Sequence, residues 1–317
     1  MITTRQGLSA AVLILALTGC GTQQSDGPTT VEASTGNAAA GQTAERIALD
    51  ALPAAPTKGL AKGLTLPLDE YTYSAKDRYI WQVAVQQQWR TCMSGYGFTD
   101  FAPPAPSADI VTAQAESDMG RRYGVTDAAD AQRNGYHLVE SAAESPHWEP
   151  APGAETAVFT GSGPELSDGS YNGKAVPEGG CRGEAARAFP LPQSTEAEEA
   201  EVQTFEQSRD DSRVVAAVAA WSSCMSTKGY QVKHPFDAPD LVGESISAAE
   251  PSAEEIALAS ADIACKKTSS LVSTWHKVEQ EKQETKISQR QSVLTTNKKA
   301  RDAAVAKAVT AYEEGAK

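Results

Sequence analysis

A ten-residue phrase occurs twice in this chain, and each copy carries a cysteine. Residues 89–98 read WRTCMSGYGF and residues 221–230 read WSSCMSTKGY. Aligning Cys92 with Cys224 also pairs a tryptophan and a methionine, although the 317 residues include only five tryptophans, four methionines and five cysteines. The repetition therefore predicts two copies of one structural unit. In such units Trp89 and Trp221 are expected to do equivalent work, each stacking on its own methionine and covering its own disulfide.

Each predicted unit has a second cysteine farther along the chain. Cys181 lies in PEGGCRGEAARAF and Cys265 lies in ASADIACKKTSSL, and both follow an acidic residue at minus three and precede a basic residue. All three pairings of the four cysteines respect this symmetry, and the slow rise of loop-closure entropy with length excludes none of them. Because local closure is the simplest pairing, we predict Cys92–Cys181 and Cys224–Cys265 disulfides in an oxidising compartment.

The first residues have the pattern of an export signal. A polar stretch with one basic residue, Arg5, precedes the apolar run AAVLILAL, which is shorter than the about 20 residues of a membrane-spanning helix. The run ends in LTGC at Cys20, which resembles the lipobox of bacterial lipoproteins. The resemblance implies that residues 1–19 are a signal peptide and that Cys20 is acylated, with palmitate-type chains holding the protein on the extracellular face of the cell membrane. A plain signal peptide with a chance cysteine, or an unprocessed anchor, is the alternative.

The residues after Cys20 predict a disordered tether. GTQQSDGPTTVEASTGNAAAGQT is rich in small and polar residues, and no aromatic residue occurs before Tyr71, so this segment cannot bury much apolar surface. We assign the acylated cysteine and the tether to residues 20–68. The rest of the chain is divided into a first helical unit with an irregular insertion, 69–193, and a second helical unit, 194–317.

The helical periodicity predicts a mainly α fold. The first helix has Ser74 as its N-cap, Asp77 three residues later and Gly97 as a left-handed stop. Residues 195–228 predict one longer helix, in which acidic residues come early, where the helix dipole favours them. Its apolar positions are Val202, Phe205, Val214, Val215, Val218 and Trp221.

The largest predicted helix runs from about residue 252 to residue 312, because no proline or glycine interrupts this stretch. Its apolar stripe is expected to pack against residues 195–228 as one half of an antiparallel helical hairpin. The stripe consists of Ile256, Ile263, Leu271, Trp275 and Val278. The polar segment EQEKQETK interrupts the heptad pattern, so a continuous coiled coil is not predicted.

The insertion, residues 99–180, is rich in proline, glycine, serine and alanine, and it predicts irregular structure. RRYGVTDAADAQRNGYH predicts one short helix, capped by Thr126 and ended by Gly135. GSGPELSDGSYNGKAVPEGG predicts turns and a small β-hairpin.

No motif in the chain identifies a reaction. The histidines are His137, His147, His234 and His276. None has metal-ligand spacing, the chain has no complete phosphate-binding loop or G-x-S-x-G motif, and the cysteines form no C-x-x-C pair. We therefore expect no metal and no cofactor. If the protein is an enzyme, its site is expected in the insertion at Asp127, Asp130 and His137, and a pocket that joins these three side chains would favour this hypothesis. An apolar groove along the helices would instead favour a binding module.

The charge of the chain argues against nucleic-acid binding. It has 28 basic and 41 acidic residues, which gives a formal net charge of −13, whereas nucleic-acid-binding domains carry basic surfaces. Lys266–Arg301 is the exception, with nine basic and three acidic residues. Contact with anionic lipid or wall polymer is one reading of this stretch, and a solvated helix face paired with the acidic body is the favoured one.

These features together resemble uncharacterised lipoproteins of high-GC Gram-positive bacteria. The resemblance rests on the lipobox, the alanine-rich tether, the paired CMxxxGY…C helices and phrases such as RYGVTD and VPEGGCRGEA. It implies disulfides and a place on the cell envelope, and it carries no activity over to this chain. We therefore expect a non-enzymatic binding or accessory module, with the membrane and an envelope or transporter protein as partners. An envelope enzyme is the alternative.

Overall fold

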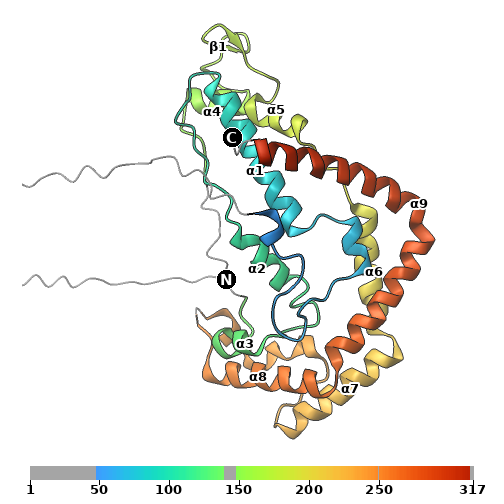
Figure 1. Ribbon diagram of the computed structural model, residues 1–317. Helices are drawn as coiled ribbons and strands as arrows, with labels where there is room; N and C mark the ends of the chain where they lie inside the picture. Colours follow the sequence, from blue (N-terminus) through green and yellow to red (C-terminus); the bar gives the residue numbers. More distant parts are fainter. Residues whose placement is uncertain (1–47, 139–147, 249, 315–317) are drawn as a thin grey trace, which may run out of the picture. The chain divides into compact units, whose positions relative to one another are not determined.

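A computed structural model describes residues 48–138, 148–248 and 250–314 (Figure 1). The fold is mainly α-helical, as the sequence predicts, and it contains a small antiparallel sheet. The α-helices are α1 (Ala75–Ser94), α2 (Asp109–Ser117), α3 (Ala128–Asn134), α4 (Ala154–Thr160), α5 (Gly180–Ala188), α6 (Thr195–Arg209), α7 (Ser212–Thr227), α8 (Ala253–Thr268) and α9 (Leu271–Glu314). The 3-10 helices are η1 (Leu49–Ala51), η2 (Pro67–Tyr71), η3 (Pro235–Asp237) and η4 (Pro239–Ser247). Cys20 and the predicted signal peptide lie outside the described residues.

The insertion contains more helix than the sequence predicts, because α2, α3 and α4 all lie within residues 99–180. The predicted hairpin is confirmed: β1 (Ser170–Tyr171) pairs with β2 (Lys174–Ala175).

Two N-caps show how local side chains set the helix starts. Ser74 and Asp77 form the predicted capping box, in which each side chain accepts a hydrogen bond from the backbone N–H of the other residue. The prediction for α3 is wrong by one residue, because the side chain of Asp127, not that of Thr126, accepts the capping bond. The hydroxyl of Thr126 is buried and donates to a backbone carbonyl in the preceding loop. Gly135, with φ of 55°, follows the end of α3 as predicted.

The two copies of the repeated phrase end their helices with the same turn. The N–H of Phe98 donates to the carbonyl oxygen of Met93 at 3.1 Å, and the N–H of Tyr230 donates to that of Met225 at 3.0 Å. In each turn the intervening glycine has a positive φ, 94° at Gly97 and 92° in the second copy. This left-handed conformation suits glycine, which has no Cβ to clash with the backbone.

Both predicted disulfides are confirmed. Cys92–Cys181 joins α1 to α5, and Cys224–Cys265 joins α7 to α8. The two Cα atoms are 5.6 Å apart in each bridge, which is a usual separation for a disulfide. Each bridge therefore closes within one of the two predicted units.

Each of the two long predicted helices is divided in the structure. Residues 195–228 form α6 and α7, because the side chain of Asp211 accepts a backbone hydrogen bond from the first turn of α7 and starts a new helix. Residues 252–312 form α8 and α9, which are separated at Ser270 with φ of 54°. A second deviation occurs inside α9 at Arg290, whose φ of −116° marks a kink. The absence of proline and glycine therefore did not guarantee a continuous helix.

The predicted antiparallel pairing of helices is confirmed for α6 and α9. Near the start of α9, the indole N–H of Trp275 donates to Ser208 Oγ at 2.7 Å, at the end of α6. Farther along α9, Arg290 pairs with Glu196 at 2.7 Å, at the start of α6. Although α9 has 44 residues, no helix in the described part of the chain is long and apolar enough to cross a membrane.

The face of α6 that packs inward agrees with the predicted one only in part. Phe205, one of the predicted apolar positions, packs against the largest buried cluster. Ala197 and Ala200 are buried in a small cluster with Leu294 of α9, so small side chains allow the two helices to approach closely. Two other predicted apolar positions, Val202 on α6 and Val215 on α7, are 60% and 53% exposed. A helix face that uses alanine for packing leaves a weaker sequence signal than one built on valine or leucine.

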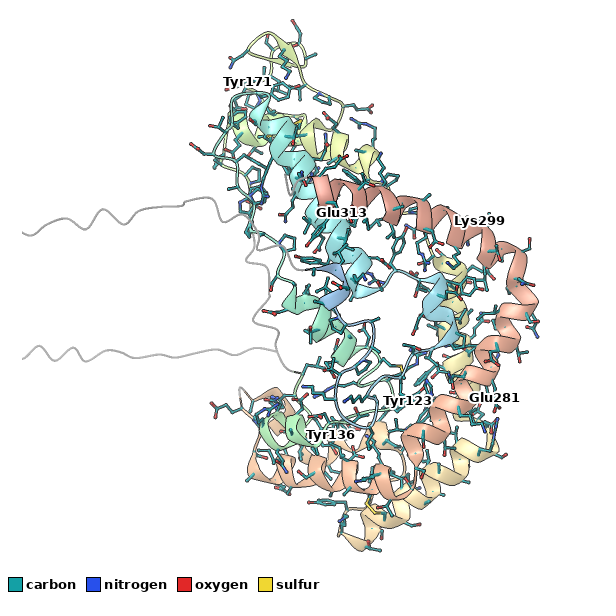
Figure 2. The ribbon with its side chains drawn as sticks, viewed as in Figure 1. Tyr123, Tyr136, Tyr171, Glu281, Lys299 and Glu313 are labelled. Carbon is teal, nitrogen blue, oxygen red and sulfur yellow. A yellow bond between two sulfur atoms is a disulfide. The ribbon has the colours of Figure 1, made fainter. Side chains whose placement is uncertain are left out.

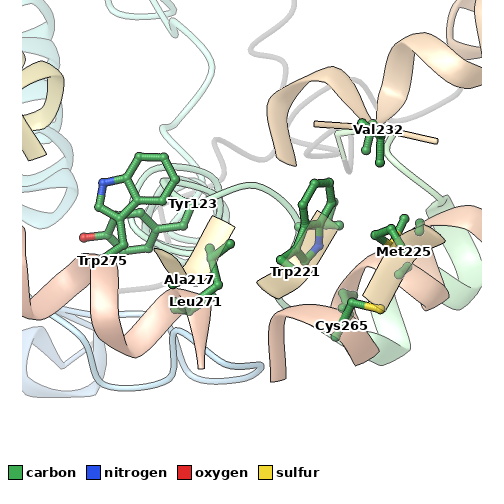
Figure 3. Close-up of a cluster of buried hydrophobic side chains, with 14 of the residues drawn as sticks. Tyr123, Ala217, Trp221, Met225, Val232, Cys265, Leu271 and Trp275 are labelled. Carbon is green, nitrogen blue, oxygen red and sulfur yellow. The ribbon is translucent and has the colours of Figure 1, made fainter. Parts of the chain in front are cut away.

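The largest buried cluster combines side chains from both predicted units. Tyr123 and Tyr136 belong to the insertion, and both are labelled in Figure 2. They are buried in the same cluster as Trp221 of α7 and Trp275 of α9. Figure 3 shows Tyr123 beside Trp275, and their ring centroids are 5.4 Å apart. The sequence boundary at residues 193 and 194 therefore does not separate two cores.

Two further observations disagree with the predicted domain boundaries. Tyr312, near the end of α9, packs edge-on against Tyr79 of α1, with ring centroids 6.2 Å apart. Leu66 and Leu68 are buried, although the sequence assigned them to the disordered tether. The ordered part of the chain therefore begins before residue 69 and includes the segment from residue 48 onwards.

The repeated tryptophans are equivalent only in part. Each belongs to the same buried cluster as its own methionine and its own disulfide, as predicted, but the two differ in burial and in polar contacts. Trp221 is fully buried, and its indole N–H donates to Asp262 Oδ1 at 2.8 Å. Trp89 is half-buried and packs edge-on against Phe159, with ring centroids 5.2 Å apart. Its buried indole nitrogen has no hydrogen-bond partner among the described residues. The repeat preserved the turn after the helix and not the polar contact of the tryptophan.

We predict that Trp221→Phe destabilises the protein more than Trp89→Phe. Both changes remove similar apolar volume, but only Trp221→Phe removes a hydrogen bond to a buried carboxylate, which contributes about 1.5–3 kcal/mol. Urea unfolding monitored by circular dichroism measures the difference. Equal losses of unfolding free energy in the two variants would show that the bond from Trp221 to Asp262 contributes nothing.

Candidate functional site

A cavity of about 380 Å³ lies between the segment that precedes α1, the end of α2 and α6. This volume falls within the range of small-molecule sites. Part of its wall is apolar and is made by Pro53, Pro56, Leu64, Leu66, Ala115 and Met119. The charged part of the wall is made by Asp69, Asp118, Glu198, Glu201, Arg78 and Arg122.

The 3-10 helix η2 forms one side of this cavity and is fixed from two directions. Asp69 accepts a hydrogen bond from the N–H of Leu66 at 2.7 Å, which caps the start of η2. The N–H of Leu68 donates to Gln283 Oε1 of α9 at 2.9 Å. Since Gln283 is fully buried, this bond holds η2 against the interior face of α9.

Arg122 forms another part of the wall and is held by a buried carboxylate. Its Nε donates to both carboxylate oxygens of Glu279, at 2.9 and 3.0 Å, and a terminal nitrogen makes a further contact. Glu279 lies on α9 and is fully buried. The hydroxyl of Tyr123 donates to Glu279 Oε2 at 2.8 Å, so two neighbouring residues of one loop bind the same carboxylate.

The interactions among Glu279, Arg122 and Tyr123 keep the Arg122 side chain charged and the Tyr123 hydroxyl neutral. Burial alone would lower the pKa of Arg122, but the hydrogen bonds and the charge of Glu279 outweigh burial and raise that pKa. Burial raises the pKa of Tyr123, and the charge of Glu279 raises it further. Glu279 therefore largely neutralises Arg122, which adds little free positive charge to the cavity.

Glu201, on α6, is the titratable group in the cavity whose protonation changes near neutral pH. Burial raises its pKa to about 7, the charge of Arg122 opposes this shift, and the charges of Asp69 and Glu198 add to it. No hydrogen bond or ion pair of its carboxylate occurs among the described residues, in contrast to Glu279. Glu201 is therefore available to a ligand.

Tyr73 also lines the cavity. Its hydroxyl is buried and has no hydrogen-bond partner in the described part of the chain. An unsatisfied buried hydroxyl costs about 1–3 kcal/mol. Because this oxygen is itself buried, Tyr73 contributes its ring, and not its hydroxyl, to the surface that a ligand could contact.

A second group of buried charges lies away from the cavity and is already satisfied. Lys266 and Asp262 of α8 are both fully buried, with Lys266 Nζ 3.0 Å from Asp262 Oδ2. Lys266 also donates to the carbonyl of Val125 at 3.0 Å. Burial raises the pKa of Asp262 and lowers the pKa of Lys266, while their mutual attraction opposes both shifts. The pair ties the insertion to α8 and has no opening to a ligand.

The three residues expected for an enzyme site do not meet in one pocket. Asp127 caps α3, and Asp130 pairs with Lys58 at 2.7 Å. Both line a small cavity of about 20 Å³, which is too small for an organic substrate. His137 is not part of that cavity; its Nε2 lies 3.3 Å from Glu255 Oε2.

Metal ligation has no geometric basis in residues 48–138, 148–248 and 250–314, where no group of three or more His, Cys, Asp or Glu side chains is arranged to hold an ion. His147 lies outside the described residues.

The sequence missed the cavity for identifiable reasons. The composition of residues 53–66 predicts a tether, and a tether is not expected to form the wall of a cavity. Glu198 and Glu201 have i, i+3 spacing on α6, which places them on one helix face. Sequence reasoning attributed the acidity of this helix to its dipole, and only the fold shows that this face meets η2 and Arg122.

Comparisons with known proteins do not indicate a function for this chain. Searches against family models, curated proteins and solved structures found no match.

We predict that Glu201→Gln removes a pH dependence from the stability of the fold. The pKa of Glu201 is raised to about 7 in the folded state, so the folded protein holds this proton more tightly than the unfolded chain does. The unfolding free energy of the wild type should therefore fall as pH rises from about 4.5 through about 7. Glutamine does not titrate, so the variant should match the wild type at about pH 4.5 and exceed it by about 1–2 kcal/mol at about pH 8, after allowance for solvent screening.

Chemical unfolding at a series of pH values measures this effect. Glu199→Gln, an exposed change on the same helix and outside the cavity, is the matched control and should keep the wild-type pH dependence. A Glu201→Gln variant with the same pH profile as the wild type would contradict the assignment of the titrating group.

Proposed function

We propose that this protein is a lipid-anchored, extracytoplasmic binding protein of the cell envelope, without a catalytic activity of its own. The observation that carries this proposal is the cavity, which has the volume of a small-molecule site and a wall that combines apolar residues with charged ones. Glu201 offers a ligand a carboxylate that has no hydrogen bond or ion pair among the described residues.

Binding is favoured over catalysis because the cavity lacks a paired set of reacting groups. A general base with a pKa near 7 is useful when it lies in hydrogen-bonding contact with a nucleophile or with a second acid. Glu201 has such a pKa, but no such contact joins it to another side chain in the described part of the chain. A carboxylate in this setting is suited to holding a ligand by charge.

The location on the envelope is supported by two independent features. The start of the chain resembles a lipoprotein signal that ends at Cys20, a residue outside the described part of the structure. The other four cysteines form two disulfides, which persist in oxidising compartments and are rare in the reducing cytosol. The same start is one of the features on which the resemblance to envelope lipoproteins of high-GC Gram-positive bacteria rests.

An accessory role beside a membrane protein fits this location. A lipid anchor and a tether would hold the cavity near the membrane surface, where a transporter could receive the bound ligand. The partner class in this proposal is therefore an envelope or transporter protein.

We predict that Cys20→Ser changes where the protein is found. Serine has no thiol to acylate, so the variant should either leave the membrane or remain unprocessed with its signal attached. Cell fractionation followed by mass spectrometry of the N-terminus measures both outcomes, and Thr22→Ser, two residues downstream, is the control that should stay on the membrane. A correctly cleaved Cys20→Ser protein that remains in the membrane fraction would contradict the lipid anchor.

A further inference from the structure

The charges around the cavity do not balance. Its wall includes four carboxylates and two guanidinium groups. One of the guanidinium groups, that of Arg122, is already neutralised by Glu279 behind the wall. The other belongs to Arg78, which is exposed to solvent like three of the four carboxylates, so solvent screens these charges alike. The fourth carboxylate, that of Glu201, is less exposed and remains without a free cation in the wall. The cavity therefore has an excess of negative charge once its acidic groups are ionised.

The apolar part of the wall limits what kind of cation fits. Leu64, Leu66 and Met119 come from two separate segments and, with the prolines at positions 53 and 56, give the cavity a hydrocarbon surface. A fully hydrated inorganic ion would gain nothing from this surface, whereas an alkyl chain would be removed from water by it.

Other ligand classes fit the wall less well. An anion would be repelled by Asp69, Glu198 and Glu201, and Arg122 has little charge left to attract it. A metal ion would require several converging oxygen or nitrogen ligands, and the described residues offer no such group. A neutral alcohol would use the apolar surface and could donate one hydrogen bond to Glu201, but it would not neutralise the charge of that carboxylate.

We propose that this cavity binds a primary amine carried on a short apolar chain, with the ammonium group at Glu201 and the chain against Leu64, Leu66 and Met119. This inference rests on the proposed binding function and specifies the ligand class. An ammonium group has three donors and no acceptor, so it can donate to the carboxylate of Glu201, which has no hydrogen-bond partner among the described residues.

The protonation of Glu201 links binding of an amine to pH. At a pH below about 7 the carboxyl of Glu201 holds a proton. The carboxyl must lose this proton before it can pair with a cation. The charged and titratable groups around it come from η2, the segment between η2 and α1, α1, the end of α2, the loop after α2, α6 itself and α9. They are Asp69, Arg122, Glu198, Glu279, Arg78, Tyr73 and Asp118. Affinity for the amine should therefore rise about tenfold between about pH 6 and about pH 8, because an alkylammonium, like lysine, stays charged throughout this range.

Isothermal titration of the full-length mature protein in detergent tests the proposal with three probes of the same length. Hexylamine, hexanol and hexanoate share their hydrocarbon chain and differ in the charge of the head group. At about pH 8 we expect saturable binding of hexylamine, binding of hexanol at least about tenfold weaker, and no binding of hexanoate. Glu201→Gln should weaken hexylamine binding at least about tenfold and remove its pH dependence, whereas Glu199→Gln should bind as the wild type does.

A second variant locates the site. Ala115 lines the cavity, so Ala115→Phe should occupy its space and abolish hexylamine binding, whereas Ala129→Phe, at an exposed position on α3, should leave binding intact. Circular dichroism of each variant verifies folding before titration.

The outcomes separate this inference from the proposed function. Hexanoate or hexanol that binds as tightly as hexylamine, in a manner blocked by Ala115→Phe, would overturn the amine specificity and leave the binding function standing. Unchanged hexylamine binding in Ala115→Phe or Glu201→Gln would overturn the placement of the ligand. If none of the three probes binds the wild type, both the amine inference and the use of this cavity as a small-molecule site are contradicted, whatever the Cys20→Ser fractionation shows about the membrane anchor.

Discussion

The structure depends on one buried carboxylate, that of Glu279 on α9. A carboxylate removed from water costs several kcal/mol unless charges and donors replace its hydration. Arg122 and Tyr123 provide this replacement, and Gln283, one turn later on α9, binds both Glu279 and the backbone of η2. The loop after α2 and the segment before α1 are therefore both fixed to the interior face of the C-terminal helix.

This arrangement explains why the chain folds as shared cores although its sequence looks like two units. The disulfides Cys92–Cys181 and Cys224–Cys265 each act within one predicted unit. The contacts of Glu279 act across the boundary, as do the packing of Tyr123 on Trp275 and of Tyr79 on Tyr312. The cavity is a consequence of the same contacts, because η2 and Arg122 would not face α6 without them.

The sequence predicted features that depend on local rules and missed those that depend on tertiary contacts. The capping box at Ser74, the glycine turns and the hairpin follow from residue types at fixed spacing, and the disulfide pairs follow from the repeat together with the choice of the most local closure. The breaks at Asp211 and Ser270 were missed because the expectation used only proline and glycine as interruptions, although an aspartate can start a new helix.

The cavity could not be predicted for a related reason. Its apolar side comes from a segment whose composition resembles a tether, and its charges come from positions that are distant in sequence. Glu279 lies within the polar stretch EQEKQETK, which the sequence predicts to be solvated, yet it is fully buried.

A double-mutant cycle between Arg122→Met and Glu279→Met tests the contact between Arg122 and Glu279 most directly, with the free energy of unfolding as the readout. We expect each single change to cost about 3–5 kcal/mol and the double change to cost at least about 2 kcal/mol less than the sum, because each single change leaves one charge unpaired. Costs that add to within about 0.5 kcal/mol would contradict the account, since the two side chains would then not stabilise each other.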